Sequence, residues 1–302
     1  MLSIITCSRR PVPNESLVNN LKNTVGLEYE LISIDNSKNE YSIFSAYNKG
    51  IDLSKYEHLC FIHDDVDFKT QDWGQKVVKH LQIPDSGIFG VAGGDIMSRV
   101  PNDWATLNPC AYMIYGQTAT QDEEMVVFPN DYNQSTKSVL MLDGVFLFAR
   151  KELFKTISFD ESFNGFHGYD YDISLQSHVA GYTNYVIYDI LLEHYSRGVM
   201  GHSYFSAQLK LHQKWGKYLP LFNRSFDQRG IDTILPKIEQ DAFDIFYKRL
   251  VRSKIAISDI HTMVRFYASK AGLKSVLKNV FCLYISVFFL RLSSIMRGKM
   301  IE

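Results

Sequence analysis

Short apolar runs alternate with segments of helical periodicity over the first 65 residues of the chain. Apolar, β-branched runs at 2–6, 30–34 and 59–62 predict strands, and each run ends in polar residues. Apolar residues at helical spacing predict helices over 16–25 and around 46–51. The order strand, helix, strand, helix, strand is typical of a parallel sheet with crossover helices, so we expect an α/β fold.

Further along the chain the periodicity is less regular. The spacing of apolar residues predicts a helix at 73–81 and a strand at 88–92. The stretch 97–137 has weak periodicity and predicts long loops or short antiparallel strands. Strands are then predicted at 139–142, 145–149 and 185–192, and a short helix at 150–154. Beyond about residue 201 the pattern becomes helical.

The composition is that of a folded protein with a substantial core. Hydrophobic residues make up 46% of the chain and charged residues 22%, which is ordinary for a globular domain. The net charge of -1 gives no overall attraction to nucleic acid, so we expect no nucleic-acid partner. The four cysteines are far apart and form no CxxC pair, which favours a reducing, cytoplasmic setting without disulfides. The first residues show no charged leader before a long apolar core, so no signal peptide is expected.

Polar side chains follow three of the predicted strands, at Ser8, Asp35 and the pair Asp64-Asp65. The carboxyl ends of parallel strands meet at one edge of a sheet, which is where such sheets bind ligands. Carboxylates there can hold Mg²⁺ or Mn²⁺ while a bound diphosphate supplies further oxygen ligands. The alternative is a solvated acidic turn, because polar residues end most strands.

The order and spacing of these motifs resemble those of family 2 glycosyltransferases with the GT-A fold. The segments that carry the resemblance are 3–11, 34–37, 48–50, 61–66, 143–144, 163–175 and 193–196. The resemblance covers roughly residues 1–200. It implies a GT-A catalytic domain over 1–220, with a nucleotide-binding half at about 1–100 and an acceptor half at about 101–220. A helical C-terminal region at 221–302 would follow.

Carried over residue by residue, the resemblance implies a donor site. Asp35 would receive the nucleobase, and Ser8 lies on the loop that lines the nucleotide. Asp65 aligns with the last acid of the family's DxD motif, which contacts the metal, and Asp64 would lie near the ribose or phosphate. His63 stands where the family has its first Asp, so Asp65 is expected to be the principal metal ligand.

His194 is a further candidate for the metal shell. It follows the strand-like run at 185–192, and in related GT-A enzymes a histidine in this region can complete the coordination. A neutral imidazole can do so near neutral pH. A mixed nitrogen and oxygen shell suits Mn²⁺ better than Mg²⁺, and a purely structural histidine is the alternative.

The resemblance also implies a catalytic base. Asp170 occupies the base position of the family's Glu-Asp-x-Asp-type motif, with Tyr169 in place of the preceding Glu. A base of this kind takes the proton of the acceptor hydroxyl. Asp172 is expected to cap the helix that follows it. Asp143 and His167 are expected to face the donor sugar or the acceptor.

Together these features predict an inverting glycosyltransferase. It would move a sugar from a nucleoside diphosphate-sugar, with UDP favoured, to a hydroxyl of a glycan or lipid-linked acceptor of the bacterial surface-polysaccharide type, such as lipopolysaccharide or capsule. One alternative is a nucleotidyltransferase, although the first strand lacks the expected Gly-rich phosphate loop. Another is a non-catalytic scaffold that binds carbohydrate, given the altered DxD motif. The oligomeric state is left open.

The C-terminal tail suggests where the protein works. Residues 260–301 hold seven Lys or Arg and no Asp or Glu. The apolar run at 280–290 is shorter than the ~20 residues of a spanning helix. A basic, apolar helix of this kind can attach to the inner face of the cytoplasmic membrane, which we expect for this cytoplasmic protein. The alternative is a helix that packs on the catalytic domain or on a partner chain.

Overall fold

The computed structural model describes residues 1–115, 124–127, 134–196, 202–252, 257–272 and 289. The chain forms two compact units. The first comprises Met1–Asp95 and Asn108–Gly198, and the second comprises Ile96–Leu107 and Val199–Glu302. This grouping differs from the boundary expected near residue 220, because it joins residues 199–220 to the helices that follow them.

The first unit is built on a seven-stranded sheet in the order β10-β13-β5-β12-β3-β1-β2. Five strands point the same way, and only β10 and β12 run against them. The expected α/β class with a mainly parallel sheet is therefore confirmed. The strands are β1 (Leu2–Ser8), β2 (Tyr29–Asp35), β3 (His58–Ile62), β5 (Ser86–Gly90), β10 (Thr136–Val139), β12 (Phe146–Arg150) and β13 (Thr183–Ile187).

The helices of this unit follow the expected crossover pattern. The side chains of Asn14 and Ser42 cap the first two helices by accepting hydrogen bonds from the backbone N–H groups of Ser16 and Ser45. The short helix near residue 152 is a 3₁₀ helix rather than an α-helix. The helices are α1 (Glu15–Thr24), α2 (Ile43–Leu53), α3 (Trp73–His80), η1 (Lys151–Lys155) and α4 (Tyr169–Val179).

A second sheet in the same unit has the order β11-β6-β8-β14-β4, with β9 paired to β8. Its long strand β8 lies within the stretch for which loops or short antiparallel strands were expected. In the pair formed by β4 and β14, His194 lies opposite Val66. The strands are β4 (Val66–Phe68), β6 (Ala92–Gly94), β8 (Pro109–Tyr115), β9 (Glu124–Val127), β11 (Met141–Leu142) and β14 (Leu192–His194).

Two apolar runs that predicted single strands are divided between the two sheets. The run at 185–192 ends in β13 and resumes in β14, and the run at 139–142 is shared by β10 and β11. In the first break, Leu191 O accepts a hydrogen bond from Lys69 N at 2.9 Å. The prediction was wrong here because both sheets are buried, so an apolar run does not reveal which sheet it joins.

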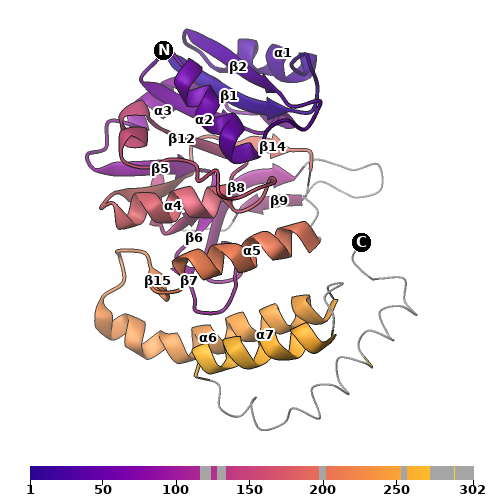
Figure 1. Ribbon diagram of the computed structural model, residues 1–302. Helices are drawn as coiled ribbons and strands as arrows, with labels where there is room; N and C mark the ends of the chain where they lie inside the picture. The colour runs from indigo at the N-terminus through magenta and orange to yellow at the C-terminus, as the bar shows by residue number, and fades with distance from the viewer. Residues whose placement is uncertain (116–123, 128–133, 197–201, 253–256, 273–288, 290–302) are drawn as a thin grey trace. The chain divides into compact units, whose positions relative to one another are not determined.

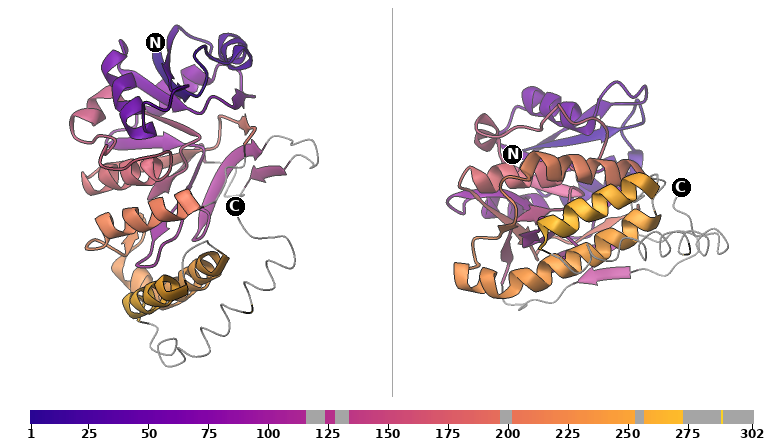
Figure 2. Two further views of the ribbon diagram at one scale, coloured as in Figure 1. Left: turned by 45° about the vertical axis from the view of Figure 1, so that its right-hand side comes forward. Right: turned by 60° about the horizontal axis from the view of Figure 1, so that its bottom comes forward.

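The second unit is mainly helical, which confirms the expected helical C-terminal region. It contains α5 (His202–Trp215), α6 (Gln228–Arg252) and α7 (Ile257–Lys270), and a short antiparallel pair of β7 (Ile96–Met97) with β15 (Leu221–Phe222). Helices α6 and α7 lie side by side (Figures 1 and 2). The Asp103 carboxylate, on the chain segment that enters this unit, pairs with Arg249 at 2.7 Å.

No helix in the described part of the chain is long and apolar enough to cross a membrane. The apolar run at 280–290 lies outside the described residues except for Phe289. The expected attachment of this tail to a membrane therefore stays a prediction.

Asn184 fastens α4 to the main sheet. Its side-chain oxygen accepts hydrogen bonds from Ile88 N at 3.1 Å and from Ser177 Oγ at 2.7 Å. Its side-chain nitrogen donates to Leu140 O at 3.1 Å and to Ser174 O at 2.9 Å. Because the side chain is buried, these four bonds meet its full hydrogen-bonding capacity without water. They fix α4 against β5 and β13 (Figure 1).

Replacing Asn184 by Ala should lower the free energy of unfolding by roughly 2–4 kcal/mol, because buried partners lose their hydrogen bonds. Urea unfolding followed by circular dichroism measures this change. The matched control is Asn23→Ala on the exposed face of α1, which should change the free energy of unfolding by less than about 0.5 kcal/mol. Equal effects of the two substitutions would contradict the assigned role of Asn184.

Candidate active site

The carboxyl ends of β1, β2 and β3 bring the predicted donor-binding residues together. Ser8 lies opposite Asp35 in the register of β1 and β2. The Ser8 hydroxyl donates a hydrogen bond to Asp64 Oδ2 at 2.6 Å. Asp35 is exposed, and hydrogen bonds from the backbone and side chain of Ser37 lower the pKa of its carboxyl. The edge of the sheet therefore presents an ionised, accessible carboxylate beside a serine-bound one.

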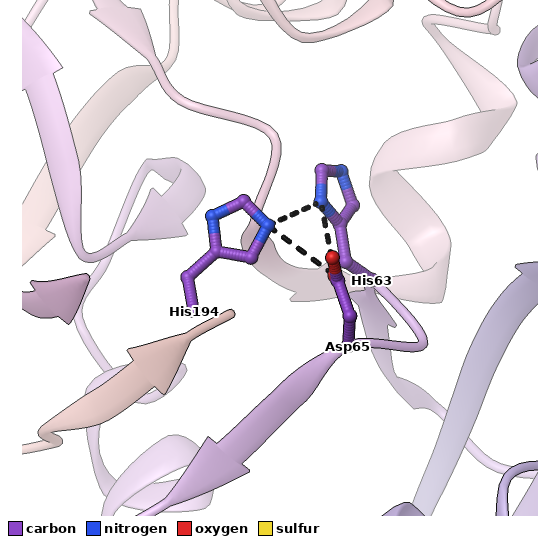
Figure 3. A group of neighbouring side chains, drawn as sticks. All are labelled: His63, Asp65 and His194. Atoms are coloured by element: carbon purple, nitrogen blue, oxygen red, sulfur yellow. Dashed lines mark hydrogen bonds and ion pairs between the residues drawn. The ribbon is translucent and has the colours of Figure 1, made fainter. Parts of the chain in front are cut away.

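His63, Asp65 and His194 converge at the same edge (Figure 3). His194 Nε2 lies 3.3 Å from Asp65 Oδ1 and 3.3 Å from His63 Nδ1. His63 Nδ1 lies 4.0 Å from Asp65 Oδ1. These are two nitrogen atoms and one oxygen atom facing one another across a small triangle.

The end of β3 places His63, and the pairing of β4 with β14 places Asp65 and His194. His63 follows β3, and its backbone N–H donates to Val145 O at 3.2 Å. Asp65 directly precedes β4, and its carbonyl oxygen accepts a hydrogen bond from Tyr195 N at 3.0 Å. His194 is the last residue of β14, the partner strand of β4. Residues more than 120 positions apart in the chain are thus held at adjacent ladder positions.

The protonation states of this group favour binding of a cation. Burial and the neighbouring His194 lower the pKa of His63, which keeps its ring neutral. Burial acts to raise the pKa of Asp65, but the hydrogen bond and the electrostatic attraction from His194 outweigh it, and the net pKa is lowered. A neutral imidazole and an ionised carboxylate are the forms that ligate metals.

The arrangement fits a divalent metal ion. Ligand atoms that each lie ~2.1 Å from one ion are about 3–4 Å from one another, and the three separations here fall in that range. Imidazole nitrogen suits transition metals, whereas Mg²⁺ prefers oxygen atoms alone. His63, Asp65 and His194 would hold such an ion, and Mn²⁺ matches the donor set better than Mg²⁺.

Asp170 lies at the start of α4, two residues after Gly168. Gly168 is the N-cap residue of the helix and has a φ of 83°. Its Oδ2 atom accepts a hydrogen bond from Gly144 N, and its Oδ1 atom accepts one from Tyr171 N, both at 3.0 Å. Burial, with a further contribution from the negative charge of Asp143, raises the pKa of Asp170 to about 8. A carboxyl with a pKa near the working pH is suited to proton transfer.

The remaining predicted residues are Asp143, His167 and Asp172. Asp143 follows β11, and its side chain accepts a hydrogen bond from Val145 N at 2.9 Å. His167 is partly buried in the turn before α4, and burial lowers its pKa. Asp172 does not cap a helix, because α4 begins earlier, at Tyr169. Its carboxylate instead accepts from Gln176 Nε2 at 2.7 Å.

Two participants were missed by the sequence reasoning. His63 was treated as a departure from the acidic pattern that weakened the metal site, whereas the structure places it beside the other two ligand candidates. The signal that could have identified His63 as a metal ligand was its position in the motif, where the family has its first Asp. Tyr169 contacts His63 Nε2 at 2.9 Å through its hydroxyl, and nothing in the sequence pattern pointed to that contact.

Family comparison identifies a glycosyltransferase-like enzyme. A family model described as "Glycosyltransferase like family" matches residues 3–203, which is 201 of the 302 residues. The chain belongs to this family. Its α/β domain, followed by helices, has the fold class expected from the resemblance to GT-A enzymes. No curated protein matches the sequence.

Two solved structures are similar to the chain at low identity. A197 from STIV is 15% identical with a TM-score of 0.37, over 65% of this chain and 85% of that one. GalNAc-T7, solved with UDP, GalNAc and Mn²⁺, is 12% identical with a TM-score of 0.48, over 92% of this chain. The chain spans only 56% of the length of the GalNAc-T7 chain.

The raised pKa of Asp170 should be visible by ¹³C NMR of the aspartate carboxyl groups in the metal-free protein. We expect a midpoint near 8, because burial disfavours the charged form. Asp143→Asn should move this midpoint to lower pH, because it removes a negative charge that opposes ionisation. Asp172→Asn, on the same helix, should leave the midpoint in place. A wild-type midpoint near the ordinary pKa of Asp would contradict the claim that burial and Asp143 raise the pKa of Asp170.

Proposed function

We propose that the protein is an inverting glycosyltransferase that uses a nucleoside diphosphate-sugar donor and a divalent cation. The observation that carries the proposal is the convergence of His63, Asp65 and His194. The Tyr169 hydroxyl of α4 contacts His63, and the next residue of that helix, Asp170, has a carboxyl of raised pKa. Membership of the glycosyltransferase-like family supports the same reaction class.

The donor nucleotide would lie along the ends of β1 to β3. Asp35 would accept hydrogen bonds from the base, because it is exposed and ionised at the end of β2. Ser8 lines the nucleotide loop and holds the carboxylate of Asp64, which would face the ribose or phosphate. A uridine base is favoured by the sequence resemblance.

The metal would be Mn²⁺ held by His63, Asp65 and His194. When bound, the ion would neutralise charge on the departing diphosphate. His194 and His63 offer nitrogen ligands, and Asp65, whose pKa is lowered, supplies the negative charge that draws the ion in. Mg²⁺ is the weaker candidate, since two of the three ligand atoms are nitrogens.

Asp170 would act as the general base. In its ionised form it takes the proton of the acceptor hydroxyl as that oxygen forms a bond to the anomeric carbon. The bond from this carbon to the diphosphate oxygen breaks, and its electron pair leaves with the nucleoside diphosphate. Attack from the face opposite the leaving group inverts the anomeric centre. Hydrogen bonds from Gly144 N and Tyr171 N fix the carboxylate in place.

Asp143 and His167 are proposed to contact the donor sugar or the acceptor, because both lie on segments next to Asp170. The acceptor is proposed to be a glycan or a lipid-linked sugar. A role in bacterial surface-polysaccharide synthesis at the inner face of the cytoplasmic membrane completes this proposal and rests on the sequence resemblance and the basic tail.

Mn²⁺ binding and donor hydrolysis test the metal site. Isothermal titration with Mn²⁺, and release of nucleoside diphosphate from a panel of nucleotide sugars, should both depend on Asp65. We expect Asp65→Ala to weaken Mn²⁺ binding by more than ~100-fold, beyond the 10–100-fold typical of losing an outer partner. Mn²⁺ should support hydrolysis better than Mg²⁺.

Asp67→Asn is the matched control for this test. Asp67 is the next acid along the chain, and its carboxylate accepts a hydrogen bond from the Tyr195 hydroxyl at 2.8 Å. This variant should bind Mn²⁺ as the wild type does. If no nucleotide sugar binds or is hydrolysed by the wild type, and Asp65→Ala changes nothing, the proposed function is wrong.

Asp170→Asn separates donor binding from transfer. We expect kcat to fall by about 10²–10⁴-fold, the usual contribution of a general base, while the donor Kd measured by titration stays within a factor of two. Wild-type kcat/KM should rise with pH because the base must be ionised. The rise should be centred at or below pH 8, since a bound cation lowers the pKa of a nearby carboxyl.

Asp172→Asn is the control for the base, since its carboxylate is bound within its own helix. This variant should retain the wild-type pH profile. Undiminished turnover by Asp170→Asn would remove Asp170 from the proposed role.

A further inference from the structure

We propose that Tyr169 is a positioning residue that fixes the ring of His63 as a metal ligand. The same hydroxyl ties His63 to the residue that holds the carboxylate of Asp170. The inference rests on the proposed function, since it presupposes a divalent cation at His63, Asp65 and His194.

The Tyr169 hydroxyl has two close partners. Its oxygen lies 2.9 Å from His63 Nε2 and 3.0 Å from Gly144 O. A phenol has one proton to donate, and a carbonyl oxygen can only accept. Both contacts are satisfied together only when the phenol donates to Gly144 O and His63 Nε2–H donates to the phenol oxygen. The geometry thus assigns the proton of the neutral His63 ring to Nε2.

This tautomer leaves Nδ1 of His63 with a free electron pair. Nδ1 is the atom that lies 3.3 Å from His194 Nε2 and 4.0 Å from Asp65 Oδ1. The ring therefore presents an unprotonated nitrogen to the position where the ion would bind. Metal-bound histidines usually donate their second ring N–H to an outer partner, which fixes the tautomer and the ring orientation.

Tyr169 is held firmly enough to act in this way. Its ring is buried in an aromatic cluster with Phe44, Tyr47 and Phe159, at centroid distances of 6.2, 5.4 and 6.3 Å. A Cβ atom added to Gly144 would lie 2.1 Å from the Tyr169 hydroxyl oxygen. The close approach of the phenol therefore requires glycine at this position.

Gly144 connects the two halves of the reaction chemistry. Its carbonyl oxygen accepts the hydrogen bond from Tyr169, and its N–H donates to Asp170 Oδ2 at 3.0 Å. Two consecutive residues of α4, Tyr169 and Asp170, thus bind Gly144 in the turn between β11 and β12. The metal ligand His63 and the base Asp170 are held relative to each other through this glycine.

Tyr169→Phe tests the inference, because it keeps the ring in the cluster and removes only the oxygen. We expect the Kd for Mn²⁺, measured by isothermal titration on the full chain, to rise by about 10–100-fold. In the metal-free protein, two-dimensional ¹H–¹⁵N NMR of the histidine rings should show His63 protonated at Nε2 in the wild type. The variant should show a mixture of tautomers.

The matched control is Phe159→Leu, which alters the packing around the Tyr169 ring and leaves the Tyr169 hydroxyl in place. The Phe159 side chain has no polar atom, so it makes no hydrogen bond to His63 or Gly144. This variant should leave the Mn²⁺ Kd and the His63 tautomer unchanged. A similar loss of affinity in both variants would mean that Tyr169 acts only through packing and would overturn the inference.

A double-mutant cycle with His63→Ala shows whether Tyr169 acts through His63. If it does, His63→Ala and the double variant should have the same Mn²⁺ Kd, whereas additive losses would overturn the inference. A wild-type His63 protonated at Nδ1 would overturn it without any variant. If the wild type binds no Mn²⁺ but carries the Nε2–H tautomer, the metal part of the proposed function fails while the hydrogen-bond assignment stands.

Discussion

The antiparallel pairing of β4 with β14 is the interaction on which the candidate site depends. Each strand is only three residues long, yet their register places His194 opposite Val66 and next to Asp65. Bonds outside the ladder reinforce it, from Tyr195 N to Asp65 O and from Lys69 N to Leu191 O. A shift of one residue would turn His194 to the other face of the sheet, because side chains alternate along a strand.

The second constraint is the concentration of acidic groups at one edge of the main sheet. Asp64 and Asp65 follow β3, Asp143 follows β11, and Asp170 lies in α4. Burial, and after it the negative charge of Asp143, raises the pKa of Asp170. Ser8, His194 and the N–H of Gly144 satisfy individual carboxylates. Such an edge favours a cation, and a cation with a diphosphate would in turn ease ionisation of the base.

Much of the fold was predictable because its signals are local. The strands β1, β2 and β3 and the helices between them follow from apolar periodicity and from caps such as Asn14 and Ser42. The division of 185–192 between two sheets was not predictable, because both halves are apolar and buried. The roles of His63 and Tyr169 were also missed, since their contact joins residues 106 positions apart.

The sequence by itself determined the class of the protein, because strand ends, acidic motifs and helix patterns are written in consecutive residues. It placed Ser8, Asp35, Asp64, Asp65 and Asp170 among the candidates without showing which of them meet. Only the tertiary structure decided that His63, Asp65 and His194 converge, and that Tyr169 and Gly144 link His63 to Asp170. The reason is that distances between side chains depend on strand register and close packing, which a linear pattern does not specify.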